Sequence, residues 1–270
     1  MMEHCQAYGV LGFPLGHSLS PYLHNMAFRK LGIPGCYFKW EIAPGDLEQF
    51  MSSFRLLSLS GLSVTIPHKE SIMDMLDQVS FEAGEIGAVN TVYRHKDLVV
   101  GTNTDYAGFL GPIQSLDLSS ALVLGAGGAS RAVIYGLKKM GCSKIIISNR
   151  TEMKAWKMAE EFGIEHAPWS RKGQCRADLL VNTTPLGTAG AGGPQNPWDQ
   201  DELPFQVVYD LVYNPLETPL LKAARQNRLT TVSGLGMFVH QALEQFRIWT
   251  GQSFDPNWAE DLLGSRLTGQ

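Results

Sequence analysis

The sequence predicts an α/β protein of two domains with largely parallel sheets, and three observations carry this prediction. Short apolar runs rich in β-branched residues alternate with longer segments of helical period, which is typical of sheets covered by helices. One such run leads directly into a glycine-rich turn and a helix, "LVLGAGGASRAVIYGLKK". The 270 residues, 44% of them hydrophobic, suffice for one large core or two smaller ones.

The first half of the chain predicts one α/β unit. A strand at 7–12 precedes a helix expected over 20–31, with Ser20 as its N-cap and Pro21 at the first helical position. Strands and helices then alternate, and one helix is expected to begin directly after Pro67. The other strands of this unit are expected at 36–42, 61–66, 88–94 and 97–103, and its other helices at about 44–56 and 80–86.

The second half of the chain is more regular. The glycine turn lies in a βαβ pattern whose second strand is expected at 143–149, followed by a helix at 152–163. Two helices close the chain, and we expect them to return to the first domain. The predicted domains are therefore 1–104 plus 238–270, and 105–237. Further strands of the second sheet are expected at 178–184, 206–213 and 229–234.

Composition excludes several classes of function. Lys and Arg number 22 against 26 Asp and Glu, so the net charge of −4 offers no basic field for nucleic acid. The four cysteines are scattered without a CxxC pair, which predicts reduced, mostly buried thiols and neither a zinc site nor a disulfide framework. No metal site is expected, because no carboxylate or thiolate is spaced to join a histidine. The sequence carries no signal peptide pattern or long apolar run, so we expect a cytoplasmic protein without a membrane partner.

The glycine turn predicts a dinucleotide site. Gly125, Gly127 and Gly128 stand between a buried strand and a helix, where glycine lets the backbone turn tightly and approach a pyrophosphate. The phosphate charge then meets the N–H groups at the start of the helix. Ser130 takes the third position of the fingerprint and is small enough for close packing. A purely steric turn is the alternative, but the βαβ context favours a Rossmann-like nucleotide-binding domain.

The end of the next strand predicts which dinucleotide binds. An acidic residue there would bind the ribose hydroxyls of NAD, whereas an arginine accommodates the extra phosphate of NADP. This sequence has Asn149, Arg150 and Thr151 at that place, with Lys154 one helical turn further on. The alternative is an ordinary helix start, with Thr151 as N-cap and a solvated arginine. The glycine turn upstream favours the phosphate site, so we expect NADP(H).

Polar residues in the first domain gather at predicted strand ends, where ligands of α/β sheets bind. They lie in the stretches "GHSLSP", "TIPHK", "AVNT" and "GTNTD". Together with the glycine turn, these motifs resemble the shikimate dehydrogenase family. The resemblance spans nearly the whole chain, through "GFPLGHSLSPYLHN", "VTIPHKE", "GAVNT", "NTDYAGF", "GAGGASRA", "NRT", "NTTPLG", "YDLVYNPLETPLL" and "GLGMFVHQA".

The resemblance implies an NADP-dependent oxidoreductase that reversibly reduces 3-dehydroshikimate to shikimate, on the route to chorismate and the aromatic amino acids. It implies that Lys69 and Asp105 form the catalytic pair. It implies substrate contacts from Ser18, Ser20 and Tyr213 near the carboxylate and from Thr65, Asn90 and Gln241 at the ring hydroxyls. The cofactor residues that it implies, together with those read from the strand end above, are Gly125, Gly127, Gly128, Ala129, Asn149, Arg150, Thr151, Lys154, Leu211 and Gly234.

Several alternatives stay open at this point. Taken singly, Lys69 is compatible with an exposed first-turn lysine, and Asp105 with an N-cap. An NAD-dependent quinate/shikimate dehydrogenase is the nearest rival enzyme, and a catalytically inactive ligand-sensing relative is a rival from another class. The residues leave open which of Lys69 and Asp105 moves the proton, and whether the protein is a monomer or a homodimer.

Overall fold

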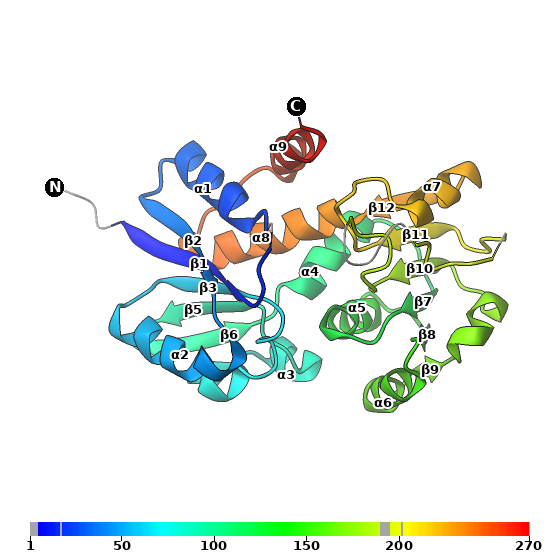
Figure 1. The fold of residues 1–270 in the computed structure, drawn as a ribbon, viewed down its shortest axis with the longest axis horizontal. Coiled ribbons are helices and arrows are strands. Elements are labelled where there is room, and N and C mark those ends of the chain that lie inside the picture. The colour runs from blue at the N-terminus through cyan, green and yellow to red at the C-terminus, as the bar shows by residue number, and fades with distance from the viewer. Residues whose placement is uncertain (1–4, 17, 190–194, 201, 270) are drawn as a thin grey trace. The chain divides into compact units, whose positions relative to one another are not determined.

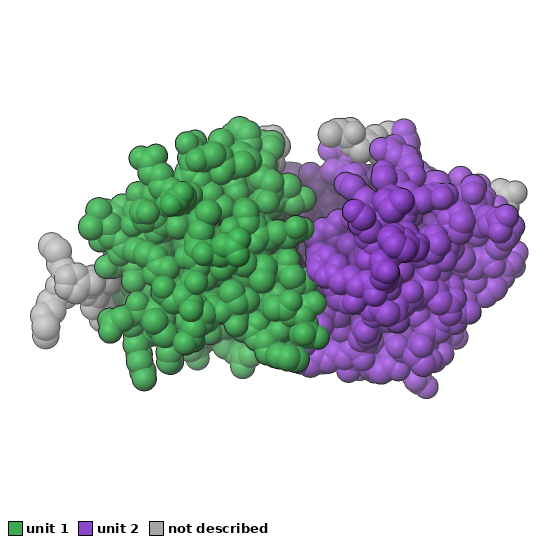
Figure 2. Space-filling model, turned by 90° about the horizontal axis from the view of Figure 1, so that it is seen from below, with its two compact units in different colours: residues 1–104, 241–263 green, residues 105–240, 264–270 purple. Residues whose placement is uncertain are grey.

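The computed structural model describes residues 5–16, 18–189, 195–200 and 202–269. The chain forms two compact units, shown in different colours in Figure 2. Unit 1 comprises residues up to 104 together with 241–263, and unit 2 comprises 105–240 together with the segment from 264 onward. The predicted domains divide the chain slightly differently, because residues 238–240 and the last turn of the chain cluster with unit 2.

Unit 1 is built on a mixed six-stranded sheet in the order β2-β1-β3-β5-β6-β4. Figure 1 labels the first five of these strands. Strand β1 pairs in parallel with β2 and β3, and β4 pairs in parallel with β6. Strand β5 is antiparallel to both of its neighbours, and a short turn joins it to one of them, β6. The strands are β1 (Gln6–Gly12), β2 (Gly35–Glu41), β3 (Gly61–Val64), β4 (Gln78–Val79), β5 (Thr91–His95) and β6 (Leu98–Thr102).

Helices cover both faces of this sheet. Helix α2 (Leu47–Leu56) places Phe54 in an apolar core with Leu11 and Leu62 of the sheet. On the other face, aromatic rings of α1 (Ser20–Leu31) and of the second half of α8 (Gly234–Thr250) pack on Tyr8 and Tyr37. The remaining helices are α3 (Phe81–Ile86) and α9 (Pro256–Thr268).

Unit 2 contains an all-parallel sheet in the order β12-β11-β10-β7-β8-β9. Numbered from its own first strand and read from β9, this is the order 3-2-1-4-5-6 of doubly wound nucleotide-binding folds. The order reverses between β7 and β10, where such folds bind ligands. The strands are β7 (Ser120–Leu124), β8 (Lys144–Ser148), β9 (Glu165–His166), β10 (Leu179–Asn182), β11 (Val207–Asp210) and β12 (Thr230–Ser233).

Two apolar clusters hold this second sheet. Helices α4 (Asp105–Leu110), α5 (Gly128–Lys139) and α6 (Glu152–Phe162) contribute to one cluster, around Val123 and Val181. Helix α7 (Pro219–Gln226) packs in the other cluster with Trp198. Both faces of the strands are therefore buried, which explains their continuous apolar sequences.

Two local predictions are wrong. Residues 67–72 form turns followed by a short 3₁₀ segment, Met73–Met75, instead of the expected helix. The carbonyl of Lys69 accepts a hydrogen bond from Val89 N at 2.8 Å, which ties this segment to a distant part of the chain. Ser20 is not an N-cap, because α1 begins at Ser20 itself and Leu19 occupies the cap position. The elements that had not been predicted include β4, β9, α7 and the 3₁₀ segments Gly111–Ile113 and Trp169–Gln174.

The cysteines are more exposed than predicted. Cys142 is buried and Cys175 half-buried, but Cys5 and Cys36 are exposed. Cys5 directly precedes β1, and Cys36 lies on β2, the outermost strand of its sheet, so one side of each is left to solvent. In the described part of the chain, no helix is long and apolar enough to cross a membrane.

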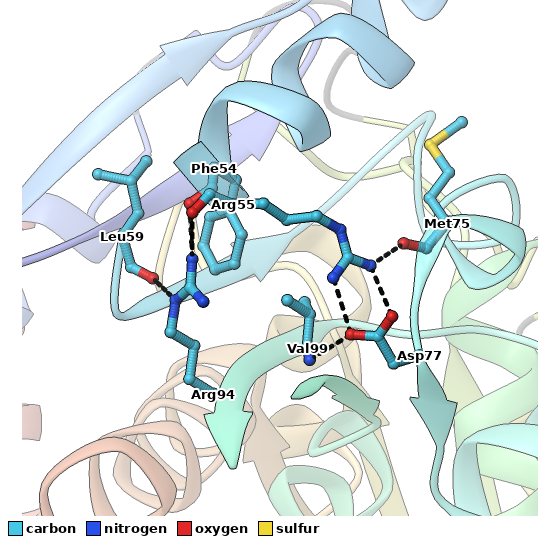
Figure 3. A network of polar contacts seen from close by, with 7 residues as sticks. All are labelled: Phe54, Arg55, Leu59, Met75, Asp77, Arg94 and Val99. Carbon is cyan, nitrogen blue, oxygen red and sulfur yellow. Dashed lines mark hydrogen bonds and ion pairs between the residues drawn. The ribbon is translucent and has the colours of Figure 1, made fainter. Parts of the chain in front are cut away.

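Two arginines fasten the carboxyl end of α2 to the sheet (Figure 3). Arg94 of β5 donates to the carbonyl oxygens of Phe54, Arg55 and Leu59, each at 2.9 Å. These carbonyls belong to the last turn of α2 and the loop after it, where a helix leaves acceptors without intrahelical donors. The positive charge also complements the negative end of the helix dipole.

Arg55 makes the second connection between α2 and the sheet. It donates to both carboxylate oxygens of Asp77, at 2.7 and 3.1 Å, and to Met75 O at 2.9 Å. Asp77 in turn accepts from Val99 N at 2.7 Å. The Arg55 guanidinium, more than the Val99 amide, holds the pKa of the Asp77 carboxyl below its usual range. Helix α2 is thereby joined to β6 as well as to β5.

Arg94→Met is expected to destabilise the protein by about 2–3 kcal/mol, because three charge-assisted hydrogen bonds are lost while most of the side-chain volume remains. Arg29→Met, at an exposed arginine in the last turn of α1, is the matched control and should cost less than about 0.5 kcal/mol. Urea unfolding followed by circular dichroism measures both values. Equal losses in the two variants would contradict the capping role of Arg94.

Candidate active site

The polar stretches predicted in the first domain end at one edge of the sheet of unit 1. Strands β1 and β3 run in parallel toward this edge, and β5 starts there because it is antiparallel to β3, with Ser63 opposite Thr91. Strand β6 ends there as well, since Thr102 pairs with Thr91. The loops that carry Ser18, Lys69 and Asn90 therefore leave the same edge.

The loop after β1 is held on both sides. Phe13 N donates to Ile66 O at 3.0 Å, and Leu15 N donates to the Glu41 carboxylate at 3.1 Å. The hydrogen bond from Leu15 is the main reason that the pKa of Glu41 is lowered. The loop then brings Ser18 Oγ within 3.4 Å of Ser20 N, with Ser20 buried and Ser18 half-buried. The two serines that we assigned to the substrate carboxylate therefore lie together.

The turn after β3 places Thr65 and Lys69. Thr65 N donates to Leu11 O at 2.9 Å, which aligns this turn with the end of β1. The neighbouring His68 is fully buried, and its Nε2 lies 2.6 Å from Ile42 O. Because a carbonyl oxygen only accepts, Nε2 carries the proton. His68 thus anchors the turn, and the half-buried Lys69 follows it directly.

Asn90 is the centre of a buried hydrogen-bond network at this edge. Its Oδ1 accepts from Thr91 Oγ1 and Thr104 N, both at 2.7 Å, and its Nδ2 donates to Thr104 Oγ1 at 3.0 Å. Its backbone carbonyl accepts from Val64 N at 2.7 Å. The amide group is therefore fixed in orientation by its neighbours, which is the condition for presenting a polar group to a ligand without reorganisation.

The sequence reasoning missed Gln245, the residue that connects this network to α8. Gln245 is buried; its Nε2 donates to Asn90 O and to Thr91 Oγ1, both at 3.1 Å, and its Oε1 accepts from Ser63 Oγ at 2.7 Å. Gln241, the predicted substrate residue, lies one turn earlier on the same face of α8. The spacing of the two glutamines was the signal that could have identified Gln245.

Asp105 belongs to unit 2, of which it is the first residue. It opens α4 and is buried, with 7% of its surface exposed. The preceding Thr104 is the last residue of the first segment of unit 1, and it contacts Asn90 of that unit. The catalytic pair implied by the resemblance therefore comes from two units, Lys69 from unit 1 and Asp105 from unit 2.

The glycine turn of unit 2 lies at the point where the strand order reverses. Gly125 has a φ of +110°, and a side chain there would overlap Thr183, so only glycine fits. Ser130 Oγ accepts from Gly127 N at 3.1 Å and lies 2.6 Å from Thr183 Oγ1. The turn after β7 is thus joined to the end of β10 by Ser130 and Thr183, a contact that the sequence did not reveal.

Gly127 and Gly128 have a different reason to be glycine. Neither has a positive φ, and a Cβ at either position would meet no heavy atom of the described residues within 4 Å. Neither the backbone conformation nor the packing of the protein requires a glycine here. Both stand where α5 begins, so the open space lies at a helix N-terminus. This arrangement fits the close approach of a pyrophosphate.

The segment expected to hold the extra phosphate follows β8. Asn149 is half-buried, and its Nδ2 donates to Thr151 O at 3.0 Å. Arg150, Thr151 and Lys154 are exposed. Thr151 occupies the N-cap position of α6, as the alternative interpretation expected, but its side chain makes no capping hydrogen bond. Two cations and a threonine hydroxyl therefore face solvent at the end of the second strand.

The residues expected at the nicotinamide end also lie together. Gly234 N donates to Val212 O at 3.3 Å, and a side chain at Gly234 would overlap the backbone carbonyl of Leu211. Tyr213, predicted near the substrate carboxylate, follows Val212 in the chain. Its ring packs on that of Phe238, with 5.2 Å between the ring centroids, and burial raises the pKa of its hydroxyl.

A buried carboxylate organises this region, and the sequence reasoning missed it. Asp210 accepts from Asn182 Nδ2 at 2.8 Å, from Val212 N at 3.1 Å and from Thr218 Oγ1 at 2.6 Å. Burial raises its pKa. It joins the loops after β10 and β11, which carry "NTTPLG" and "YDLVYNPLETPLL". An acidic residue inside an apolar strand was the available signal.

No group of three or more His, Cys, Asp or Glu side chains is placed to hold a metal ion in the part of the chain that the structure describes. The candidate site thus consists of hydroxyl, amide, lysine and carboxylate groups.

Models of three families match this chain. The shikimate dehydrogenase substrate-binding domain matches residues 10–92, the shikimate / quinate 5-dehydrogenase model matches 111–174, and the shikimate 5'-dehydrogenase C-terminal domain matches 234–256.

Known proteins are similar over nearly the full length. A shikimate dehydrogenase (NADP⁺) of Maridesulfovibrio salexigens is 46% identical, over 96% of this chain and 97% of the relative. A shikimate dehydrogenase solved in complex with NADP⁺ has a TM-score of 0.88 at 33% identity, over 97% of this chain and 96% of that one. The Thermus thermophilus enzyme, solved with NADP(H) and shikimate, has a TM-score of 0.87 at 38% identity, over 97% and 99% of the two chains. This chain therefore belongs to the shikimate dehydrogenase family.

Proposed function

We propose that this protein catalyses the reversible reduction of 3-dehydroshikimate to shikimate with NADPH, a step toward chorismate and the aromatic amino acids. Membership of the family and the names of its near relatives support this activity. The observation in the chain itself that carries the proposal is the open glycine turn at the switch point of a doubly wound sheet. The open turn gives a dinucleotide room to bind. The hydroxyl and amide groups at the sheet edge of unit 1 can hydrogen-bond a polyhydroxylated substrate.

The cofactor is held by unit 2. Backbone N–H groups at Gly128 and Ala129 donate to the pyrophosphate at the start of α5, and Gly127 leaves room for its approach. Arg150, supported by Asn149, Thr151 and Lys154, binds the 2′-phosphate. Leu211 and Gly234 line the nicotinamide end of the cofactor site. The chemistry that the nicotinamide supplies when bound is hydride transfer to and from the carbon that bears the reacting oxygen.

The substrate is held mainly by unit 1. Ser18 and Ser20 donate to the carboxylate, to which the resemblance also assigns Tyr213. Thr65, Asn90 and Gln241 hold the ring hydroxyls. Because Asn90 is already fixed by Thr91 and Thr104, its amide can meet a ring hydroxyl without reorganisation.

Lys69 and Asp105 carry out the proton transfer that accompanies hydride transfer. Reduction of the ketone builds negative charge on its oxygen, and the Lys69 ammonium stabilises that charge and can donate the proton. Asp105 accepts a hydrogen bond from the product hydroxyl. Oxidation in the reverse direction requires the pair to take the proton back.

Lys69→Ala is expected to lower turnover at least about 100-fold, with a smaller change in shikimate binding, because it removes a proton donor positioned at the reacting oxygen. The absorbance of NADPH measures the rate. Lys222→Ala, at an exposed lysine on α7, is the control and should retain normal turnover.

Asp105→Asn is expected to be similarly severe, and the pH–rate profiles of the two variants distinguish which residue moves the proton. Near-normal turnover in Lys69→Ala would show that the assignment of the proton chemistry is wrong.

The double variant Ser18→Ala, Ser20→Ala should act mainly on substrate affinity, because the two hydroxyls contact the carboxylate and not the reacting carbon. Two hydrogen bonds to a charged group correspond to roughly a 10-fold or greater rise in the Michaelis constant for shikimate. Steady-state kinetics measure it, with Ser52→Ala, Ser53→Ala on α2 as the matched control. A large loss of turnover at unchanged Michaelis constant would contradict this role.

Arg150→Ala should raise the Michaelis constant for NADP and leave that for NAD nearly unchanged, because NAD has no 2′-phosphate to lose. One charge-assisted contact corresponds to about 10- to 150-fold in the preference for NADP over NAD. Assays with both cofactors measure this ratio, with Arg171→Ala, at another exposed arginine of unit 2, as control. Equal weakening toward both cofactors would mean that Arg150 supports the adenine or the fold.

The quinate/shikimate alternative with NAD is tested by the same assays. The three residues directly after β8, Asn149, Arg150 and Thr151, include no acid that could bind bare ribose hydroxyls at the strand end. We therefore expect shikimate with NADP to be used far more efficiently than quinate with NAD.

A further inference from the structure

Two exposed cysteines of unit 1 lie in contact with each other. The Sγ atoms of Cys5 and Cys36 are 3.4 Å apart, although the residues are 31 positions apart in the sequence. The other two cysteines belong to unit 2 and have different surroundings: the Cys142 thiol contacts Lys144 O, and the Cys175 thiol contacts Arg171 O. Cys5 and Cys36 are thus the pair placed for chemistry with each other within the described residues.

The sheet holds this pair together. Strands β1 and β2 pair in parallel along seven positions, with Gln6 opposite Gly35 and Ala7 opposite Cys36. Cys5 is two residues before Ala7, so it projects to the same face of the sheet as Cys36. Gln6 N donates to Pro34 O at 2.9 Å, which extends the pairing to the residue next to Cys5. The approach of the two thiols therefore follows from the strand register.

The contact also gives the two sulfurs different roles. Cys5 donates its S–H to Cys36 Sγ. This hydrogen bond, more than burial, raises the pKa of the Cys5 thiol. Cys5 therefore keeps its proton more readily, and its S–H points at the Cys36 sulfur. Both residues are exposed, so a small oxidant can reach them.

We propose that Cys5 and Cys36 are a redox modification site, which a small-molecule disulfide such as oxidised glutathione converts into a reversible disulfide between β1 and β2. The Cys36 thiolate attacks one sulfur of the oxidant, forming a mixed disulfide and releasing one glutathione thiolate, which takes up a proton. The Cys5 sulfur, as it loses its proton, then attacks the Cys36 sulfur and releases the second glutathione. The two protein thiols are oxidised and the oxidant is reduced to two thiols.

The site lies away from the candidate active-site edge. Cys5 and Cys36 stand at the amino ends of β1 and β2, whereas Ser18 and Ser20 follow the carboxyl end of β1. Seven strand residues, roughly 23 Å, separate the two ends of β1. The disulfide closes the loop that contains α1, so it should stabilise unit 1 by restricting its unfolded state.

Peptide mapping after treatment of the full-length protein with oxidised glutathione tests the proposal. The expected product contains a disulfide between the tryptic peptide that ends at Arg29 and the peptide that ends at Lys39. The count of reactive thiols in denaturant should fall from four to two, and dithiothreitol should restore it. The melting midpoint of the oxidised protein should rise by at least about 3 °C.

Variants separate this pair from the other thiols. Cys142→Ala, Cys175→Ala should still form the linked peptide, whereas Cys5→Ser and Cys36→Ser should each yield only a mixed disulfide with glutathione. If Cys5 and Cys36 in the wild-type protein remain as separate mixed disulfides, or link two chains, the proposal is wrong. These readouts use no substrate, so they are independent of the proposed activity.

Discussion

Backbone hydrogen bonds made just beyond the strand ends are the constraint on which the candidate site depends. A strand that leaves its sheet loses its ladder partners, and its buried N–H and C=O groups must find others. In unit 1, Thr65 N donates to Leu11 O. Val64 N donates to Asn90 O, and Val89 N donates to Lys69 O. Each bond joins one loop to the next, so loops far apart in the chain take fixed positions at one edge. The residues assigned to the substrate inherit their placement from these bonds.

Unit 2 meets the same constraint with buried side chains. Asp210 satisfies Val212 N and binds Asn182 and Thr218, while Thr183 and Ser130 connect β10 to the glycine turn. The carboxylate is buried at the cost of a raised pKa, which three hydrogen bonds limit. Such polar groups specify loop geometry more than they add stability. These contacts lie inside the protein, so the space beside Gly127 and Gly128 at the start of α5 stays open.

Burial distinguishes the residues that orient the site from the residues that are proposed to meet a ligand. His68 and Asp210 are buried and hydrogen-bonded within the protein, so their roles are to orient and to anchor. Lys69 is half-buried and Arg150 exposed, which suits groups that meet a ligand and lose solvent only when it binds. The exposed thiols of Cys5 and Cys36 stand at the opposite edge of the sheet of unit 1, where a chemical change does not disturb these arrangements.

The sequence by itself determined the α/β class, most of the strands, the glycine turn and the family, because apolar periodicity, glycine spacing and short motifs are local properties of the chain. It located Lys69 and Asn90 at strand ends, but their assignment to ligands stays a prediction. Only the tertiary structure decided that residues 67–72 form turns, since Lys69 O is bound by Val89, which lies far along the chain. The contacts of Gln245 with Asn90 and of Cys5 with Cys36 were likewise invisible in sequence, because strand order and register, which no single segment encodes, bring such distant residues together.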